Sequence, residues 1–153
     1  MDLIRSVDFR SVLTSFKEEN PGAAAFQWTV NRLHDVERES SNWELVDLSS
    51  SDIRNIMIRG GHCHSIPEAP CLIGVHEIVS IAKASERVRG FDRDKMPDCW
   101  KNIEYQKHRD ISQTHLFLSH FKDQFWHIDG FHRMLAWVLF EKQGSVPAFV
   151  AGL

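Results

Sequence analysis

Apolar residues recur with a helical period in the first part of the chain. A first stripe, spaced i, i+3, i+4, i+7, consists of Phe9, Val12, Leu13 and Phe16. Asp8 stands in front of it as an N-cap, and Asn-Pro-Gly at 20–22 ends the helix. A second stripe with the same period consists of Phe26, Val30 and Leu33. The pattern therefore predicts two consecutive helices, followed by a polar exit segment at 37–42.

The middle of the chain alternates between extended and helical patterns. The run from Trp43 to Leu48 is typical of a strand. Hydroxyl and carboxylate side chains at 49–52 then cap a brief helix predicted from Ile53 to Ile58. An irregular loop with two prolines follows from His62 to Pro70. Beyond it, an apolar stripe predicts a longer helix from Cys71 to Arg89.

The central loop also raises a zinc hypothesis. Its metal-binding residue types, with those of the next segment, are His62, Cys63, His64, Cys71 and His76. Their spacing matches no common zinc finger or ribbon, and loop histidines are usually solvated. The spacing therefore favours a loop without a structural metal.

The last third changes from a period of 3.6 to a period of 2. A helix of weaker pattern, Asp98 to Arg109, precedes the change. Two strands, Thr114 to His120 and Phe125 to Asp129, then flank a short polar turn and form a hairpin. A helical stripe comes next, made by Phe131, Leu135, Val138 and Leu139. A closing strand, Val146 to Val150, completes an α/β (α+β) pattern in one domain spanning residues 1–153.

Composition narrows the class of protein. At 153 residues, 42% hydrophobic and 25% charged, the chain is the size of one globular domain. Three cysteines at irregular spacing fit a reducing compartment, and the first residues lack a secretory pattern, which together predict a cytoplasmic protein without a membrane span. A net charge of -3 argues against a protein that binds nucleic acid. The expected partner is a small-molecule substrate, and a homodimer stays open.

The candidate chemistry lies where the second hairpin strand runs into the helix, in the sequence Asp-Gly-Phe-His-Arg at 129–133. The first amides of a helix lack intrahelical acceptors and, with the helix dipole, favour an anion. Gly130 lets a phosphate approach the backbone, and Arg133 offers a guanidinium for the same oxygens. His132 adds a hydrogen-bond donor or a proton carrier.

Asp129 leaves several interpretations of this turn open. Its carboxylate repels an anion, so it either holds a divalent cation or acts as a base beside the ligand. His127 shares its strand face, and with His132 and His115 the set could instead hold iron or another divalent metal. A third interpretation is a non-catalytic ligand-binding module. In a fourth interpretation the turn has only a structural role, as an ordinary helix start with Asp129 as the N-cap and Arg133 in a surface ion pair.

The segment Phe125 to Gly152 combines His-Ile-Asp-Gly-Phe-His-Arg-Met-Leu-Ala with a helix and the strand Ser-Val-Pro-Ala-Phe-Val. This segment resembles the nucleotide-handling segment of the ParB and sulfiredoxin superfamily. Residues 43–53 resemble the opening strand and short helix of the same fold. The resemblance implies a core over residues 43–153 and a helical extension over 1–42. It also implies that ATP or CTP phosphates, with Mg²⁺, contact Gly130, His132 and Arg133.

Departures from the family select among its branches. Phe131 stands where sulfiredoxins carry their reactive cysteine, which argues against sulfinic-acid reduction. The chain shows no downstream DNA-binding helices, which argues against a DNA clamp. The remaining expectation is a nucleotide- and Mg-dependent transferase acting on a small polar metabolite, with Asp129, His132 and His127 catalytic. Small uncharacterised proteins of bacterial secondary metabolism show a similar pattern, so bacterial metabolism or natural-product biosynthesis is the expected context.

Overall fold

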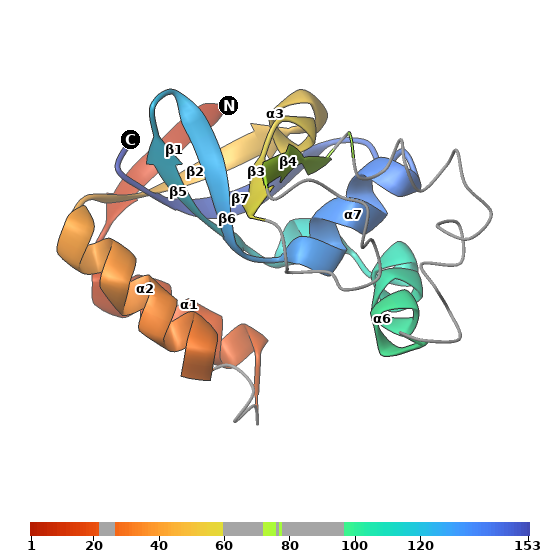
Figure 1. Ribbon diagram of the computed structural model, residues 1–153, viewed down its shortest axis with the longest axis horizontal. Helices are drawn as coiled ribbons and strands as arrows, with labels where there is room; N and C mark the ends of the chain where they lie inside the picture. The colour runs from red at the N-terminus through yellow and green to blue at the C-terminus, as the bar shows by residue number, and fades with distance from the viewer. Residues whose placement is uncertain (22–26, 60–71, 76, 78–96) are drawn as a thin grey trace.

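The computed structural model describes residues 1–21, 27–59, 72–75, 77 and 97–153, and these form a mixed sheet with helices on both faces (Figure 1). The seven strands are β1 (Asp2–Val7), β2 (Trp43–Ser49), β3 (Met57–Arg59), β4 (Leu72–Gly74), β5 (Leu116–Phe121), β6 (Gln124–Asp129) and β7 (Ser145–Ala151). The helices are α1 (Phe9–Glu19), α2 (Gln27–Glu39), α3 (Ser50–Arg54), α6 (Pro97–His108), α7 (Phe131–Leu139) and the 3₁₀ turn η2 (Ile111–Gln113).

The strands are arranged in the order β1-β2-β7-β5-β6-β3-β4. The longest ladder joins β2 to β7, antiparallel from Trp43 opposite Ala151 to Ser49 opposite Ser145. The β5–β6 pair is an antiparallel hairpin, whereas β5 with β7 and β3 with β6 are parallel. The connection from β6 through α7 to β7 therefore places α7 across the centre of the sheet, with its start at the end of β6.

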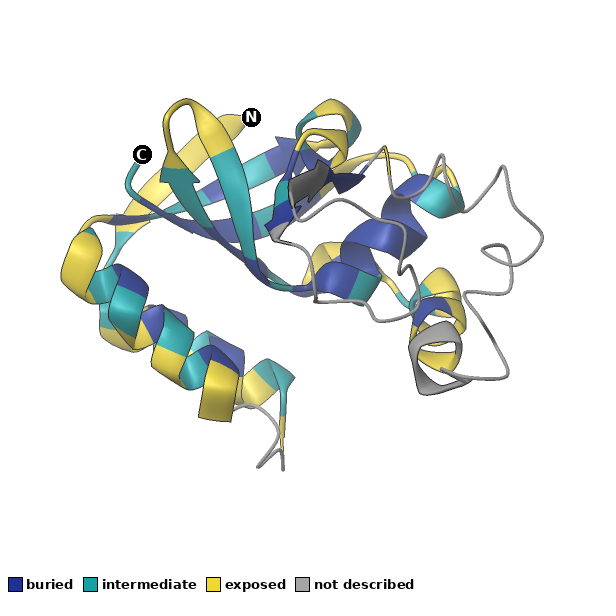
Figure 2. Cartoon of the chain, viewed as in Figure 1, coloured by how far each residue is buried: buried dark blue, intermediate teal, exposed yellow. Residues whose placement is uncertain are grey.

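Alternating side chains of the central strands enter two separate cores. On β5, Leu116 and Leu118 join a core with α3 and α7, while Phe117 joins another with α1 and α2. β7 alternates in the same way, because successive strand residues point to opposite faces. Figure 2 shows the buried positions of α7 and of the α1–α2 pair turned toward the sheet. The result is a three-layer α/β/α arrangement.

Local sequence signals explain how several elements begin and turn. Asp8 caps α1 by accepting a hydrogen bond from the Ser11 amide at 2.8 Å. Ser49 and Asp52 form a capping box at α3. The β5–β6 turn places Lys122 and Asp123 at φ of 50° and 59°, which suits a two-residue hairpin turn. Among the described residues, none forms a helix long and apolar enough to cross a membrane.

The α+β class, the two early helices, β2, α6, the hairpin, α7 and β7 agree with the sequence-based predictions. Other predictions were wrong. The predicted helix Ile53–Ile58 is instead the single turn α3, and Met57–Arg59 is a strand that pairs with β4 and β6. The predicted helix from Cys71 begins as a strand at Leu72–Gly74, and residues 78–89 lie outside the described part of the chain. The central loop at 62–70 and the residues of the zinc hypothesis also lie outside the described part of the chain.

The first residues were also interpreted incompletely. The 1–42 segment was expected to be helical, but β1 pairs antiparallel with β2 and forms an edge of the sheet. All of its residues except Val7 are exposed, and no alternating pattern marks the strand. Pairing with β2, rather than burial of its side chains, therefore holds β1 in place.

Candidate functional site

The strand-to-helix turn depends on a glycine in a left-handed conformation. Gly130 has φ of 103° and ψ of 16° and forms the N-cap of α7 without a side-chain hydrogen bond. A Cβ at this position would lie 2.5 Å from Leu116 Cδ2. The first intrahelical bond runs from the Met134 amide to Gly130 O at 3.0 Å. The amides of residues 131–133 thus have no acceptor within the helix.

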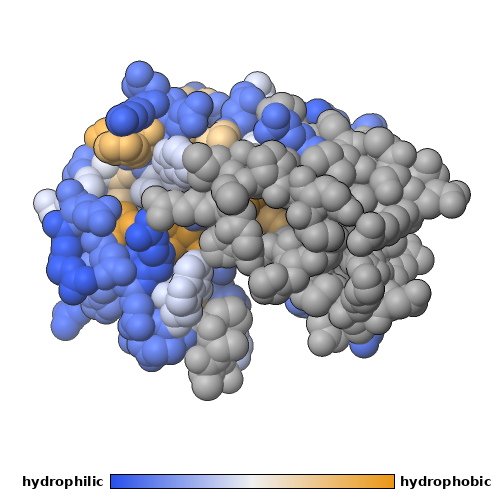
Figure 3. Space-filling model, viewed as in Figure 1, coloured by the Kyte–Doolittle hydropathy of each residue, from blue (hydrophilic) through white to orange (hydrophobic). Residues whose placement is uncertain are grey.

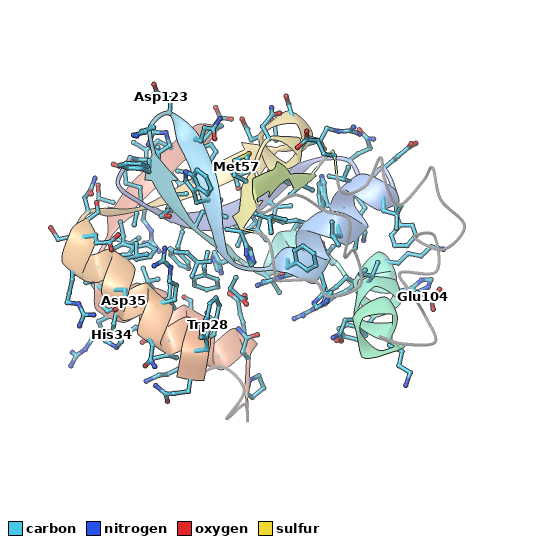
Figure 4. The ribbon with its side chains drawn as sticks, in the orientation of Figure 1. Trp28, His34, Asp35, Met57, Glu104 and Asp123 are labelled. Atoms are coloured by element: carbon cyan, nitrogen blue, oxygen red, sulfur yellow. The ribbon has the colours of Figure 1, made fainter. Side chains whose placement is uncertain are left out.

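A pocket of about 360 Å³ lies at this turn. One wall of the pocket is the segment from His127 to Arg133. A second wall comes from Asn20 at the end of α1 and from Trp28 and Thr29 on α2. Asn102 and Gln106 on α6 form a third. Trp28 is 56% exposed, and Figure 4 shows it on α2. Pockets of this volume suit small molecules.

A buried network of charged and polar groups lies behind the turn. Arg133, with 8% of its side chain exposed, donates to Asp129 Oδ2 at 2.9 Å and to Glu19 Oε2 at 3.2 Å. Glu19 also accepts a hydrogen bond from the His115 amide at 3.0 Å and contacts His115 Nδ1 at 2.5 Å. The network therefore joins α1, the start of β5, the end of β6 and α7.

Burial dominates the titration of Asp129. It raises the pKa of this carboxyl, against the opposing effects of the nearby Arg133 guanidinium and the Gly130 amide. The Glu19 carboxylate adds a smaller effect in the same direction as burial. A raised pKa makes the carboxylate a stronger base than an exposed aspartate.

The raised pKa predicts a stability effect for Asp129→Asn. The folded protein binds the Asp129 proton more tightly than the unfolded chain does. The stability that this bound proton contributes is therefore complete below the unfolded pKa of 3.8 and is lost as the pH rises through the folded pKa. Asparagine mimics the protonated form. We expect the variant to exceed the wild type in unfolding free energy at pH 8, because the buried carboxylate is charged there only in the wild type.

Urea unfolding of both proteins at pH 4 and pH 8 measures this difference. The gap between them should shrink at pH 4. Asp35→Asn serves as the control, because Asp35 forms a side-chain pair with Arg38 on the exposed side of α2. A wild type that is more stable than Asp129→Asn at pH 8 contradicts the assignment.

His132 is the second perturbed group of the pocket. Burial lowers its pKa, so the imidazole is neutral at pH 7. Within the described part of the chain, its Nε2 atom is buried and has no hydrogen-bond partner. The ring of Phe131 packs edge-on against both His132 and His127, at centroid distances of 5.4 and 6.1 Å. The neutral imidazole of His132 thus lines the pocket and, among the described residues, has one buried nitrogen without a hydrogen-bond partner.

The predicted site residues divide into two groups. His127, Asp129, Gly130, His132 and Arg133 all line the pocket. His115 does not, since it contacts Glu19 and stacks on Phe149 at a centroid distance of 4.5 Å. Over the residues that the structure describes, no group of three or more His, Cys, Asp or Glu side chains is placed to hold a metal ion.

Two residue roles differ from the sequence-based interpretation. Arg133 was expected either at a phosphate or in a surface ion pair, but it forms a buried pair with Glu19 and Asp129. Gly130 is required by its backbone angle and by the nearby Leu116 side chain, independently of any ligand. Asp129 is not the N-cap, because Gly130 takes that position.

Sequence reasoning missed the residues that reach the site from other elements. These are Glu19, Asn20, Trp28, Thr29, Asn102 and Gln106. Polar side chains at helix ends and on helix surfaces usually face solvent, so no local pattern distinguishes these. The one available signal was the exposed tryptophan on a predicted amphipathic helix.

The fold and the pocket define an α+β protein with a mixed sheet and a small-molecule-sized pocket at a strand-to-helix turn. The model of the "Family of unknown function (DUF6309)" matches residues 1–153, so the chain belongs to this family. No curated protein and no solved structure matches the chain.

Proposed function

We propose that the protein is a small-molecule enzyme that transfers a phosphoryl group from a nucleotide to a hydroxyl of a small polar metabolite. The observation that supports this best is the presence of two oppositely perturbed groups in one pocket, Asp129 with a raised pKa and His132 with a lowered one. The Asp129 shift makes this carboxylate a stronger base, the His132 shift keeps the imidazole neutral, and perturbed groups of this kind cluster at catalytic sites.

The start of α7 provides the site for phosphate oxygens. The amides of residues 131–133 lack intrahelical acceptors and border the pocket, and the helix dipole adds a positive potential there. The neutral His132 can hydrogen-bond to the same oxygens through Nε2. Arg133 supports this arrangement indirectly, because its pairs with Glu19 and Asp129 neutralise charge behind the pocket and orient the Asp129 carboxylate.

In the proposed reaction, Asp129 takes the proton from the acceptor hydroxyl while the oxygen of that hydroxyl attacks the γ-phosphorus of the nucleotide. The bond from that phosphorus to the bridging oxygen breaks, and the nucleoside diphosphate leaves with the bonding electron pair. Phosphotransfer depends mostly on positioning and on charge stabilisation, which the α7 amides would supply.

The Oδ2 atom of Asp129 is less suited to Mg²⁺ than to proton transfer. This atom receives a hydrogen bond from the Arg133 guanidinium at 2.9 Å, and a cation at that oxygen would face a second cation. We therefore assign Asp129 to proton transfer, with Mg²⁺ entering on the nucleotide phosphates.

Calorimetry and phosphorus NMR test the proposal. Wild type is titrated with ATP and CTP in the presence of Mg²⁺, then incubated with a pool of small alcohols and amino alcohols. We expect nucleotide binding and acceptor-dependent formation of a phosphate ester. Asp129→Asn should keep binding and lose about 10²–10⁴-fold in transfer rate, the typical contribution of a general base.

Asp123→Asn is the matched control, since Asp123 lies at the exposed tip of the β5–β6 hairpin (Figure 4). It should transfer at the wild-type rate. Absence of nucleotide binding at millimolar concentration sinks the phosphotransfer proposal. Unchanged transfer by Asp129→Asn removes Asp129 from its assigned role.

A further inference from the structure

A second, larger pocket lies between α2 and the β5–β6 hairpin. The volume of this second pocket is about 650 Å³. Its lining contains none of the residues of the Asp-Gly-Phe-His-Arg turn, so it is separate from the pocket at the start of α7. Trp126 lines this pocket and the adjacent His127 lines the other, as expected for neighbours on a strand. In Figure 3, hydrophobic atoms show in a recess among hydrophilic ones on the side where α2 faces the sheet.

The walls of this pocket are largely apolar. Val36 comes from α2, Ala151 from β7, and Phe121 and Trp126 from the hairpin. The Trp126 indole donates a hydrogen bond from Nε1 to the Phe121 carbonyl at 3.3 Å, which helps to orient the ring. The Phe121 side chain is 61% exposed. Together these side chains offer an aromatic surface to a flat ligand.

Arg32 provides the charge of this second pocket. Its side chain is half-buried and lines the pocket from α2. Within the part of the chain that the structure describes, its guanidinium forms no hydrogen bond or ion pair. By contrast, Arg38 on the same helix pairs with Asp35. A guanidinium without an internal partner beside an apolar wall is suited to a carboxylate from a ligand.

The acidic residue of the pocket lies away from Arg32. Glu39 is seven residues further along α2, about 10 Å along the helix axis. The Glu39 side chain is exposed, so solvent screens its charge from an anion bound at Arg32. At the Arg32 end, the positive charge and the aromatic wall therefore favour a ligand that carries both an anionic group and an aromatic ring.

From these features we propose that the pocket between α2 and the β5–β6 hairpin is a second binding site, for a small aromatic carboxylate. The carboxylate pairs with Arg32, and the ring packs against Trp126 and Val36. The site does not depend on Asp129 or His132.

Two-dimensional NMR of the ¹⁵N-labelled protein tests this site with indole-3-acetate and benzoate, each paired with its uncharged amide. We expect saturable shifts of the Trp126 indole N–H signal, assigned with Trp126→Phe. The amides should bind at least ~10-fold more weakly, since they cannot form a charge-assisted pair. Arg32→Gln should weaken carboxylate binding to a similar degree, ~10-fold.

Arg38→Gln is the matched control, as an arginine on the same helix outside the pocket, and should bind as the wild type does. Asp129→Asn should also bind normally, which separates this site from the proposed phosphotransfer site. Equal binding of acid and amide, unchanged binding by Arg32→Gln, or no saturable shift at millimolar ligand would each overturn the proposal.

Discussion

Replacing Gly130 with alanine is expected to destabilise the protein by about 3 kcal/mol, from the combined cost of a left-handed backbone and an overpacked core. The residue has φ of 103°, and the added Cβ would meet Leu116 Cδ2 at 2.5 Å. Leu116 is buried in the core beneath α7, so it cannot move without disturbing that core. Urea denaturation followed by circular dichroism measures the loss.

Gly144→Ala separates the two causes. Gly144 has nearly the same φ, 101°, but no atom lies within 4 Å of a Cβ built there. Its substitution should cost only the backbone strain, about 1 kcal/mol. Equal losses in the two variants would mean that the Leu116 contact relaxes and that backbone strain alone makes glycine necessary at position 130.

Arg133→Met is expected to cost about 3 kcal/mol, because removal of one partner leaves buried carboxylates without compensation. The side chains of Glu19 and Asp129 are only 14% and 21% exposed. Methionine keeps the apolar part of the side chain and removes the charge. The deficit relative to the wild type should diminish at low pH, where the Asp129 carboxyl, whose pKa burial raises, becomes protonated. Chemical denaturation at pH 4 and pH 7 measures both effects.

Two further variants make this result specific. Arg38→Met removes an exposed side chain from its pair with Asp35 and should cost less than about 1 kcal/mol. Arg133→Met combined with Asp129→Asn should be more stable than the sum of the two single effects predicts, since the two side chains interact directly. Additive effects would indicate that the Arg133–Asp129 pair contributes little.

The sequence by itself determined the elements whose signals are local. Asp8 as an N-cap, the period-2 pattern of the β5–β6 hairpin and the apolar stripe of α7 each depend on residues a few positions apart. The same holds for the Asp-Gly-Phe-His-Arg turn. Gly130 fits a strand-to-helix transition because it tolerates a positive φ. These patterns indicated both the α+β class and the centre of the candidate site.

Tertiary structure alone decided the elements stabilised by distant partners. β1 is exposed and held through β2, while β3 is a strand because β4 and β6 lie on either side of it. Strand pairing satisfies backbone groups whatever the side chains, so these short segments carry little sequence pattern.

The roles of the site residues were decided in the same way. Glu19 reaches Arg133 across 114 positions of the chain, and Trp28 and Asn102 complete the pocket from separate helices. Folding buried Asp129 and His132 and thereby shifted the two pKa values in opposite directions. A sequence names these side chains but does not give their burial or their neighbours, and burial and neighbours control how they titrate.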